Sequence, residues 1–152
     1  MPGMMDTILN LGLNDKTVVA LAKKTSNGRF AKDSYRRFIQ MDANVVMNVE
    51  SYHFEELIEN YKLTKGVLLD TDLDEEDWDG LIIDFKNTVK EKTNKDFPQD
   101  VHKQLFGAIS AVFLSWESNR AKVYRKFNQI PSEWGTAAVS YTHLTLPTNR
   151  EV

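Results

Sequence analysis

The sequence predicts a mostly α-helical fold with one short strand near its N-terminus. After residue 14, successive segments place apolar side chains three or four residues apart, which is the spacing of one face of an α-helix. Asparagine, aspartate, glycine and proline, which start or stop helices, fall between these segments. Before residue 14, a short apolar run is closed by Gly12, and this pattern is typical of a strand.

The predicted strand covers residues 7–14. It is preceded by Pro2 and Gly3 and closed by Gly12 and Asn14, and its apolar residues alternate only loosely with polar ones. A lone strand leaves backbone donors and acceptors unpaired along both edges. We therefore expect it to pair with neighbours that the chain itself does not supply.

Three helices are predicted between residues 14 and 66. The first is capped by Asn14 or Asp15, continues through Lys24 and is stopped by Asn27-Gly28. The second has one apolar stripe, with Ser34 filling its gap, formed by Phe30, Phe38, Met41 and Val45. The third ends before Gly66 and carries Phe54, Leu57, Ile58 and Tyr61.

The fourth predicted helix has the clearest pattern. Asp72 followed by Glu75 forms a capping-box-like start, and lysines collect toward the other end. Its apolar face consists of Trp78, Leu81, Ile82, Phe85 and Val89. The fifth helix begins near Pro98 and is expected to bury Val101, Leu105, Ala108, Ile109, Val112, Phe113 and Trp116. A last segment, after a break at Ser118-Asn119, covers Ala121 to Phe127.

The sequence suggests a separate helical subdomain and a separate C-terminal tail. We expect residues 15–96, approximately, to form a self-sufficient helical subdomain, because their apolar faces can cover one another. At the other end, the string VSYTHLTLPT at 139–148 resembles the translation of a transposon-type sequencing adapter. This resemblance predicts a non-native tail over 138–152, and the alternative is a short edge strand of β-branched residues.

Composition narrows the class of protein. The chain has 152 residues, of which 41% are hydrophobic and 27% charged, as in ordinary soluble domains. The absence of cysteine excludes disulfides, thiolate zinc sites and a cysteine nucleophile. A net charge of −3 argues against a general nucleic-acid binder. No apolar run reaches the roughly 20 residues of a membrane span, and the N-terminus lacks the basic start and apolar core of a secretion signal. We expect a cytoplasmic protein without membrane or nucleic-acid partners.

No constellation in the sequence predicts a catalytic or metal site. The acidic stretch 70–77 suggests a calcium loop, but an EF-hand starting at Asp70 needs Gly and Glu where Glu75 and Leu81 stand. Its charge suits the start of a helix better. His53 and His102 lie on different predicted helices without a triad-like arrangement.

Two further groups of residues have both a structural and a functional interpretation. The arginines at 36, 37, 120 and 125 are either solvated or ion-paired, or they form a docking surface for an acidic partner or a phosphate. Arg120 is favoured for docking because it stands at a helix break. The Met4-Met5 pair beside Gly3 is an entry turn, or a place where a flat ligand approaches the backbone.

Several strings, taken together, resemble the pyruvate, phosphate dikinase family. They appear in the family's order and with its spacing over residues 1–137: MPGMMDTILNLGLND at 1–15, RFAKDSYRRFIQM at 29–41, FPQD at 97–100, AVFLSW at 111–116 and IPSEWGTA at 130–137. Shorter matches are Gln104-Leu105, Arg120-Ala121 and Tyr124-Arg125. Asp42 departs from the pattern, because the family usually has a bulky residue at this position.

The resemblance implies an enzyme. The family moves phosphoryl groups from ATP to phosphate and pyruvate through a phosphohistidine on a swivelling domain, giving phosphoenolpyruvate, AMP and pyrophosphate. It uses ATP and Mg²⁺ and forms homodimers. This stretch would be a partial ATP-grasp-like α/β nucleotide-binding domain with an inserted helical subdomain. By position, Gly3, Met4, Met5 and Asp6 would line the ATP cleft, and Arg120 would face the swivelling domain.

The same resemblance predicts that this chain alone is inactive. The seven glycines are scattered and form neither a Walker loop nor a G-x-G-x-x-G motif, so no phosphate cradle is encoded. Phosphoryl transfer depends on positioning and on cations that stabilise charge. We therefore interpret residues 1–137 as a fragment of a dikinase. The alternative function is a self-standing helical interaction module that uses its arginines.

Overall fold

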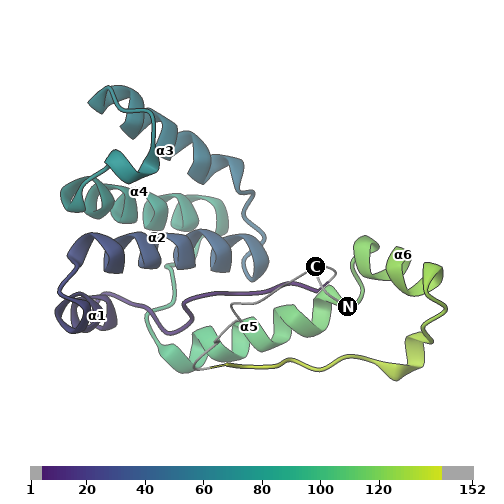
Figure 1. Cartoon of the computed structure of the whole chain (residues 1–152). Helices are drawn as coiled ribbons and strands as arrows, with labels where there is room; N and C mark the ends of the chain where they lie inside the picture. The colour runs from purple at the N-terminus through teal and green to yellow at the C-terminus, as the bar shows by residue number, and fades with distance from the viewer. Residues whose placement is uncertain (1–4, 142–152) are drawn as a thin grey trace, which may run out of the picture.

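The computed structural model describes residues 5–141, and these residues form helices joined by loops (Figure 1). The α-helices and 3₁₀-helices, in chain order, are α1 (Thr17–Thr25), α2 (Gly28–Val45), α3 (Tyr52–Lys65), η1 (Asp70–Asp72), α4 (Glu75–Thr93), α5 (Val101–Ser115), α6 (Asn119–Phe127) and η2 (Ser132–Trp134). The expectation of a mostly helical chain is confirmed for this part. Most of the proposed tail, from residue 142 on, lies outside it.

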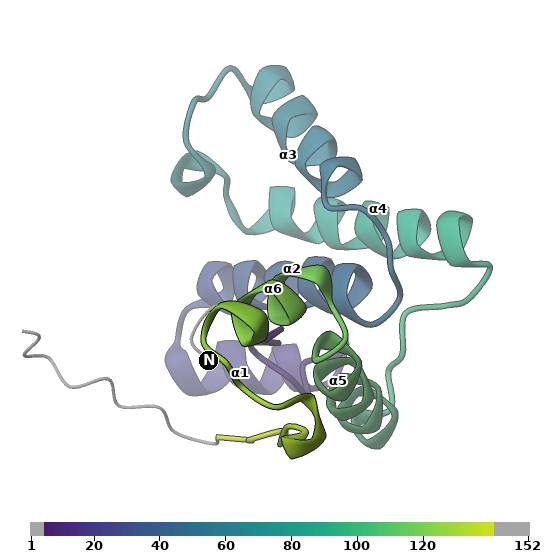
Figure 2. The same cartoon turned by 90° about the vertical axis from the view of Figure 1, so that its right-hand side faces the viewer.

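Helices α1 to α4 share one hydrophobic core. Helix α2 lies between α1 and α4, and α3 packs on α4, as Figures 1 and 2 show from two sides. The buried apolar side chains run from Val18 to Phe97, and the largest of them are Trp78, Tyr35, Phe38, Phe54 and Phe85. The face predicted for the fourth helix is confirmed, because all five of its members are buried.

The strand expected at residues 7–14 is not formed in the described part of the chain. Two of its backbone donors bond to side chains instead, Leu9 N to Met41 Sδ at 3.1 Å and Asn14 N to Thr17 Oγ1 at 2.8 Å. Positive φ angles of 58° at Asn10 and 97° at Gly12 then turn the chain. A strand needs a paired neighbour, and the described residues offer helices at this place.

The predicted cap of the first helix is confirmed, and the helix ends one residue later than predicted. Asn14 caps α1: its Oδ1 accepts from the backbone nitrogens of Lys16 and Thr17 at 2.9 and 2.8 Å. The helix ends at Thr25, because Ser26 takes a left-handed conformation. Asn27 is not a stop but the cap of α2, where its Oδ1 accepts from Phe30 N at 2.9 Å.

Two helix details are also corrected. Phe30 is exposed, whereas Phe38 and Ser34 of the predicted stripe are buried. The buried stripe of α2 also includes Ala31, Tyr35, Ile39 and Asp42. The capping box of α4 is formed by Asp74 and Asp77, and Asp72 belongs to the preceding turn η1. The end of α3 is confirmed: Gly66 closes it with a left-handed φ of 70°.

The buried face of helix α5 agrees only in part with the predicted one. The helix begins at Val101 with Asp100 as cap, and it buries Gln104, Ala108, Ala111 and Ser115, of which Ala108 was predicted. Four other predicted residues are half-buried: Leu105, Ile109, Val112 and Trp116. Phe113 and Val101 are exposed. Small residues face inward because α5 approaches α2 closely: a Cβ on Gly107 would lie 3.1 Å from Val46 Cγ1. The last segment is confirmed as α6, capped by Ser118.

Candidate functional site

The structure places two predicted site residues side by side. Gly3 and Met4 lie outside the described residues, whereas Met5 and Asp6 precede α1 and Arg120 lies on α6. Arg120 Nη2 is 2.6 Å from Asp6 Oδ1, although 114 residues separate them in the sequence. The ATP-cleft candidate and the docking candidate therefore form one site in space.

Ser115 fixes the backbone of this site. Its hydroxyl accepts a hydrogen bond from Asp6 N at 3.2 Å and donates one to Val112 O at 2.7 Å. The same oxygen lies 3.9 Å from Met5 Sδ. Sequence reasoning missed Ser115, because a serine among the apolar residues of α5 gives no signal until the N-terminal segment is placed against it.

A surface hollow of about 330 Å³ adjoins the ion pair. Its walls come from the end of α2, from α5 and from Asp6, and its lining residues are Asp6, Val45, Val46, Gly107, Ser110, Ala111, Leu114, Ser115 and Ser118. None of these lining residues is a lysine or an arginine. Hydroxyls and apolar walls suit the uncharged part of a ligand, whereas phosphate groups need cations or clustered backbone donors.

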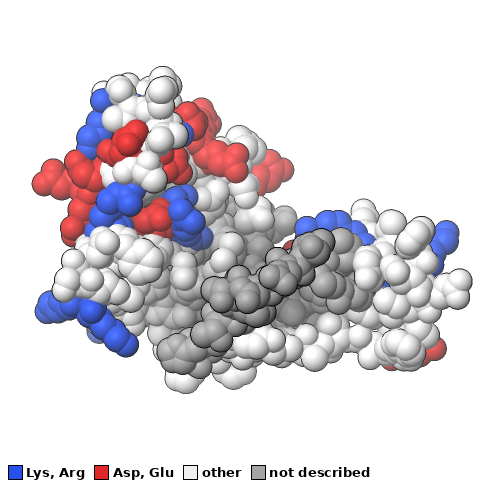
Figure 3. Space-filling view, viewed as in Figure 1, with Lys and Arg blue, Asp and Glu red and all other residues white. Residues whose placement is uncertain are grey.

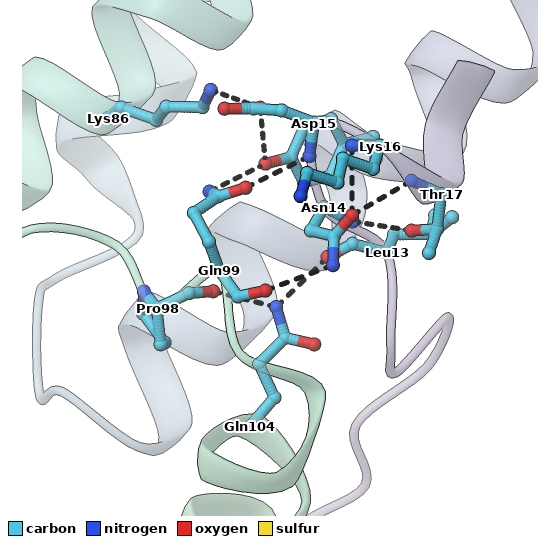
Figure 4. A network of polar contacts seen from close by, with 10 residues as sticks. Leu13, Asn14, Asp15, Lys16, Thr17, Lys86, Pro98, Gln99 and Gln104 are labelled. Atoms are coloured by element: carbon cyan, nitrogen blue, oxygen red, sulfur yellow. Dashed lines mark hydrogen bonds and ion pairs between the residues drawn. The ribbon is translucent and has the colours of Figure 1, made fainter.

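A clamp of amides holds the N-terminal segment against the loop before α5 (Figure 4). Gln104 Nε2 donates to Leu13 O at 3.0 Å and to Pro98 O at 2.7 Å, and Asn14 Nδ2 donates to Gln99 O at 3.0 Å. Gln99 Oε1 accepts from Asp15 N at 2.9 Å. Because the segment leading from Asp6 is fixed in this way, the clamp sets where the hollow and the ion pair lie.

The remaining arginines fall into buried and exposed groups. Arg36 is buried, with its guanidinium 4.7 Å from the ring centre of Trp78 and 2.6 Å from Asp33 Oδ1. Arg125 is buried as well, 4.0 Å from the ring centre of Trp116. These two arginines stabilise the fold, so the docking interpretation is wrong for them. Arg37 is exposed and pairs with Asp33 at 3.0 Å.

The acidic stretch 70–77 is used in ion pairs between helices. Asp70 Oδ1 is 3.2 Å from Lys62 Nζ, and Asp74 and Asp77 both contact Lys65. The lysine lowers the pKa of Asp74 to about 2, together with backbone hydrogen bonds from Asp77 and Glu76. In residues 5–141, no three His, Cys, Asp or Glu side chains gather in a way that would hold a metal ion. Over the same residues, no helix combines the length and the apolar character of a membrane span.

Asp42 forms a second polar feature, away from the ion pair. It is 1% exposed, and neither carboxylate oxygen has a hydrogen-bond partner. Burial raises the pKa of this carboxyl to about 6. It lies beside a hollow of about 490 Å³ between the end of α2, the loop before α5 and the start of α5, lined also by Lys95, Asp96, Lys103 and Gln104. The unusual residue noted in the sequence therefore leaves a buried carboxyl without a partner.

Two comparisons with known proteins were informative in different ways. No protein-family model matches the chain, whereas the individual proteins similar to it are all of one kind. It is 58% identical over 138 residues to a pyruvate, phosphate dikinase of Clostridium symbiosum, 51% over 137 residues to one of Rhizobium meliloti, and 52% over 141 residues to one of Entamoeba histolytica. These matches cover 90 to 92% of this chain but only 15 to 16% of each relative. The chain thus spans about a sixth of the length of these relatives.

Proposed function

We propose that the chain is part of a pyruvate, phosphate dikinase and works in the N-terminal, ATP-binding region of that enzyme. Nine-tenths of its length is similar to such dikinases. The observation that carries this proposal is 58% identity over 138 residues. The whole enzyme would move phosphoryl groups from ATP to phosphate and pyruvate through a phosphohistidine. Its products would be phosphoenolpyruvate, AMP and pyrophosphate, and it would act as a cytoplasmic homodimer.

Within that enzyme, the hollow beside Asp6 would contact the nucleotide in an ATP-grasp-like domain. Met5 and Asp6, with Gly3 and Met4, would line the cleft. The lining of the hollow offers serine hydroxyls, one carboxylate and apolar walls, which fit a base or ribose. Its lack of lysine and arginine means that the phosphates and Mg²⁺ would be held by other parts of the enzyme. The isolated chain would then be inactive.

Arg120 would face the swivelling phosphohistidine domain. Its side chain is 60% exposed and is held by Asp6, so it projects from α6 in a fixed place. A guanidinium has five donors, and one carboxylate engages only some of them. Arg120 therefore retains donors for a carboxylate or phosphate on a docking partner.

A chimeric enzyme tests the proposed function. Residues 1–137 of this chain would replace the homologous segment of the Clostridium symbiosum dikinase, and formation of phosphoenolpyruvate from ATP, phosphate and pyruvate would be measured. We expect activity within about tenfold of the parent enzyme and none from the isolated chain. A folded chimera with no activity would contradict the proposal, and so would phosphotransfer by the purified chain alone.

The second candidate function is a self-standing helical interaction module. It is favoured by the closed core of α1 to α4, whose buried side chains all lie between Val18 and Phe97. The two functions differ in what lies upstream in the DNA. An open frame that continues into Met1 supports the dikinase segment, whereas a stop codon and a ribosome-binding site just before Met1 support the module. The same DNA, read past Ala137, tests the proposed non-native tail.

A further inference from the structure

Asp42 is a carboxylate that folding removes from water without giving it a partner. It is 1% exposed, and among residues 5–141 neither of its oxygens accepts a hydrogen bond. The acidic side chains over α3 and α4, by contrast, lie on the surface and are interspersed with basic ones (Figure 3). Burying an ionised carboxylate is costly unless a cation and hydrogen-bond donors accompany it. The chemistry that complements Asp42 is therefore a group that carries positive charge and donates hydrogen bonds.

Gln104 adds a third acceptor in the same place. Its Nε2 donates to Leu13 O and Pro98 O, and these two bonds fix the orientation of the side-chain amide (Figure 4). Its Oε1 is buried and accepts no hydrogen bond from the described residues. Asp42 and Gln104 line the same hollow of about 490 Å³. A primary ammonium group carries three N–H donors, so it matches these three acceptors in number and in charge.

The exposed part of the hollow has the opposite charge. Lys95, in the loop before α5, and Lys103, in the first turn of α5, line the hollow and are exposed. Asp96 lines it as well, but its Oδ1 is 3.0 Å from Lys90 Nζ, so this carboxylate already has a cationic partner. Lysine ammonium groups form charge-assisted hydrogen bonds with carboxylates. The lining therefore suits a zwitterion, with its ammonium group inside the hollow and its carboxylate near the surface.

The remaining walls of the hollow are apolar. Val46 and Met47, just after α2, and Pro98, in the loop before α5, are half-buried lining residues. Met47 is unbranched and flexible, so it can move to admit a ligand to the buried acceptors. The volume of the hollow lies within the range of roughly 300–1,000 Å³ that is typical of small-molecule sites. Apolar walls between two charged ends suit an aliphatic side chain.

We propose that this hollow binds an α-amino acid with an aliphatic side chain. Asp42 and Gln104 hold its ammonium group, Lys95 and Lys103 hold its carboxylate, and the apolar walls contact its side chain. The site is separate from the hollow beside Asp6, with which it shares a single lining residue, so the inference goes beyond the proposed function and does not rest on it. Because its walls come from the end of α2 and the start of α5, the bound amino acid stabilises the packing of α5 on the core.

Calorimetric titration of the 152-residue chain with L-leucine tests the site, at about pH 7.5, above the pKa of about 6 that burial gives Asp42. We expect saturable binding with a Kd of about 1 mM or tighter. Asp42→Asn keeps the shape of the side chain but removes its charge, and it should weaken binding at least about tenfold. The matched control is Asp79→Asn on α4, which changes the net charge equally outside the lining and should alter the Kd less than about twofold. A lack of saturable binding, or Asp42→Asn binding as tightly as wild type, overturns the inference.

Two analogues of leucine show which of its groups are recognised. Isocaproate lacks the ammonium group and should not bind measurably. Isoamylamine lacks the carboxylate and should bind about three- to fivefold more weakly, because exposed lysines contribute modestly. Isocaproate binding as tightly as leucine would refute the role of Asp42, and isoamylamine binding equally well would refute recognition of a zwitterion.

Methyl resonances locate the bound ligand. The methyl signal of Met47 should shift as L-leucine is added, whereas those of Val18, which lies on α1 outside the lining of the hollow, should stay in place. Saturable binding that leaves the Met47 signal unmoved would put the ligand elsewhere and would also overturn the inference. None of these measurements requires dikinase activity, so their outcome is independent of the chimeric enzyme.

Discussion

Helices α1 to α4 and helices α5 and α6 use apolar residues in opposite ways. In the first unit, large side chains such as Trp78, Phe54 and Phe85 point inward and are buried completely. In α5, the inward positions are Ala108, Ala111 and Ser115, while Phe106 and Leu114 are exposed. The first unit therefore carries its own core, whereas α5 packs closely through small residues and leaves its larger ones on the surface.

The first test of this difference removes one aromatic ring from the core of α1 to α4 and one from α5. Phe85→Ala should destabilise the chain by about 3–5 kcal/mol, because Phe85 is buried and its ring centre lies 4.8 Å from that of Phe54. The matched change in α5, Phe113→Ala, should cost less than about 1 kcal/mol, since that ring is exposed. Denaturant unfolding of both variants measures the difference, and equal losses would refute the division.

The second test concerns the buried carboxyl at the boundary between the two units. The folded-state pKa of Asp42, about 6, lies above its ordinary value of 3.8, so the native state binds more protons between these pH values. Stability should therefore fall as pH rises from about 4 to about 6.5 and then stay lower, by about 3 kcal/mol at most from this group. Asp42→Asn should remove this slope. Unfolding curves from pH 4 to 8 check it.

The control for that experiment is Asp96→Asn. Asp96 lines the same hollow, but its side chain is 82% exposed, so it should leave the slope of Asp42 in place. A wild-type chain whose stability rises through this pH window would contradict the assignment, and so would an Asp42→Asn variant that retains the whole slope.

The third test weakens the attachment of α5 and leaves the core of α1 to α4 unchanged. Gln104→Ala removes two hydrogen bonds of the clamp and leaves Leu13 O and Pro98 O without these donors, which should cost about 1–3 kcal/mol. We expect faster hydrogen exchange in α5, with α2 and α4 unchanged, because the core of α1 to α4 does not include Gln104. Exchange that rises equally in α4 would show that the two units unfold together.

The smallest effect is expected at the site itself. Arg120→Ala breaks the ion pair with Asp6, but both groups are partly solvated, so the chain should lose less than about 1 kcal/mol. The loss should shrink further in high salt. A loss of 3 kcal/mol, measured by the same unfolding method, would make the pair a structural element and would argue against a docking role.

The sequence predicted features that depend on neighbouring residues along one helix. The buried face of α4 and the end of α3 at Gly66 were predicted correctly, because a period of 3.6 residues and a left-handed glycine are local properties. The role of Asn27 was predicted only in part, because an asparagine serves equally as a stop for one helix and a cap for the next, and here it caps α2. The strand at 7–14 failed for a related reason: a short apolar run does not show whether a partner strand exists.

The sequence by itself determined the helical class of the chain and, through its motifs, its similarity to pyruvate, phosphate dikinases. Only the tertiary structure decided that Asp6 meets Arg120, that Gln104 clamps the N-terminal segment, and that α5 turns its small residues inward. Helical spacing records which residues share a face, but it does not record which face meets a neighbour. That choice depends on contacts between residues as many as 114 positions apart, and such contacts are fixed only when the helices pack.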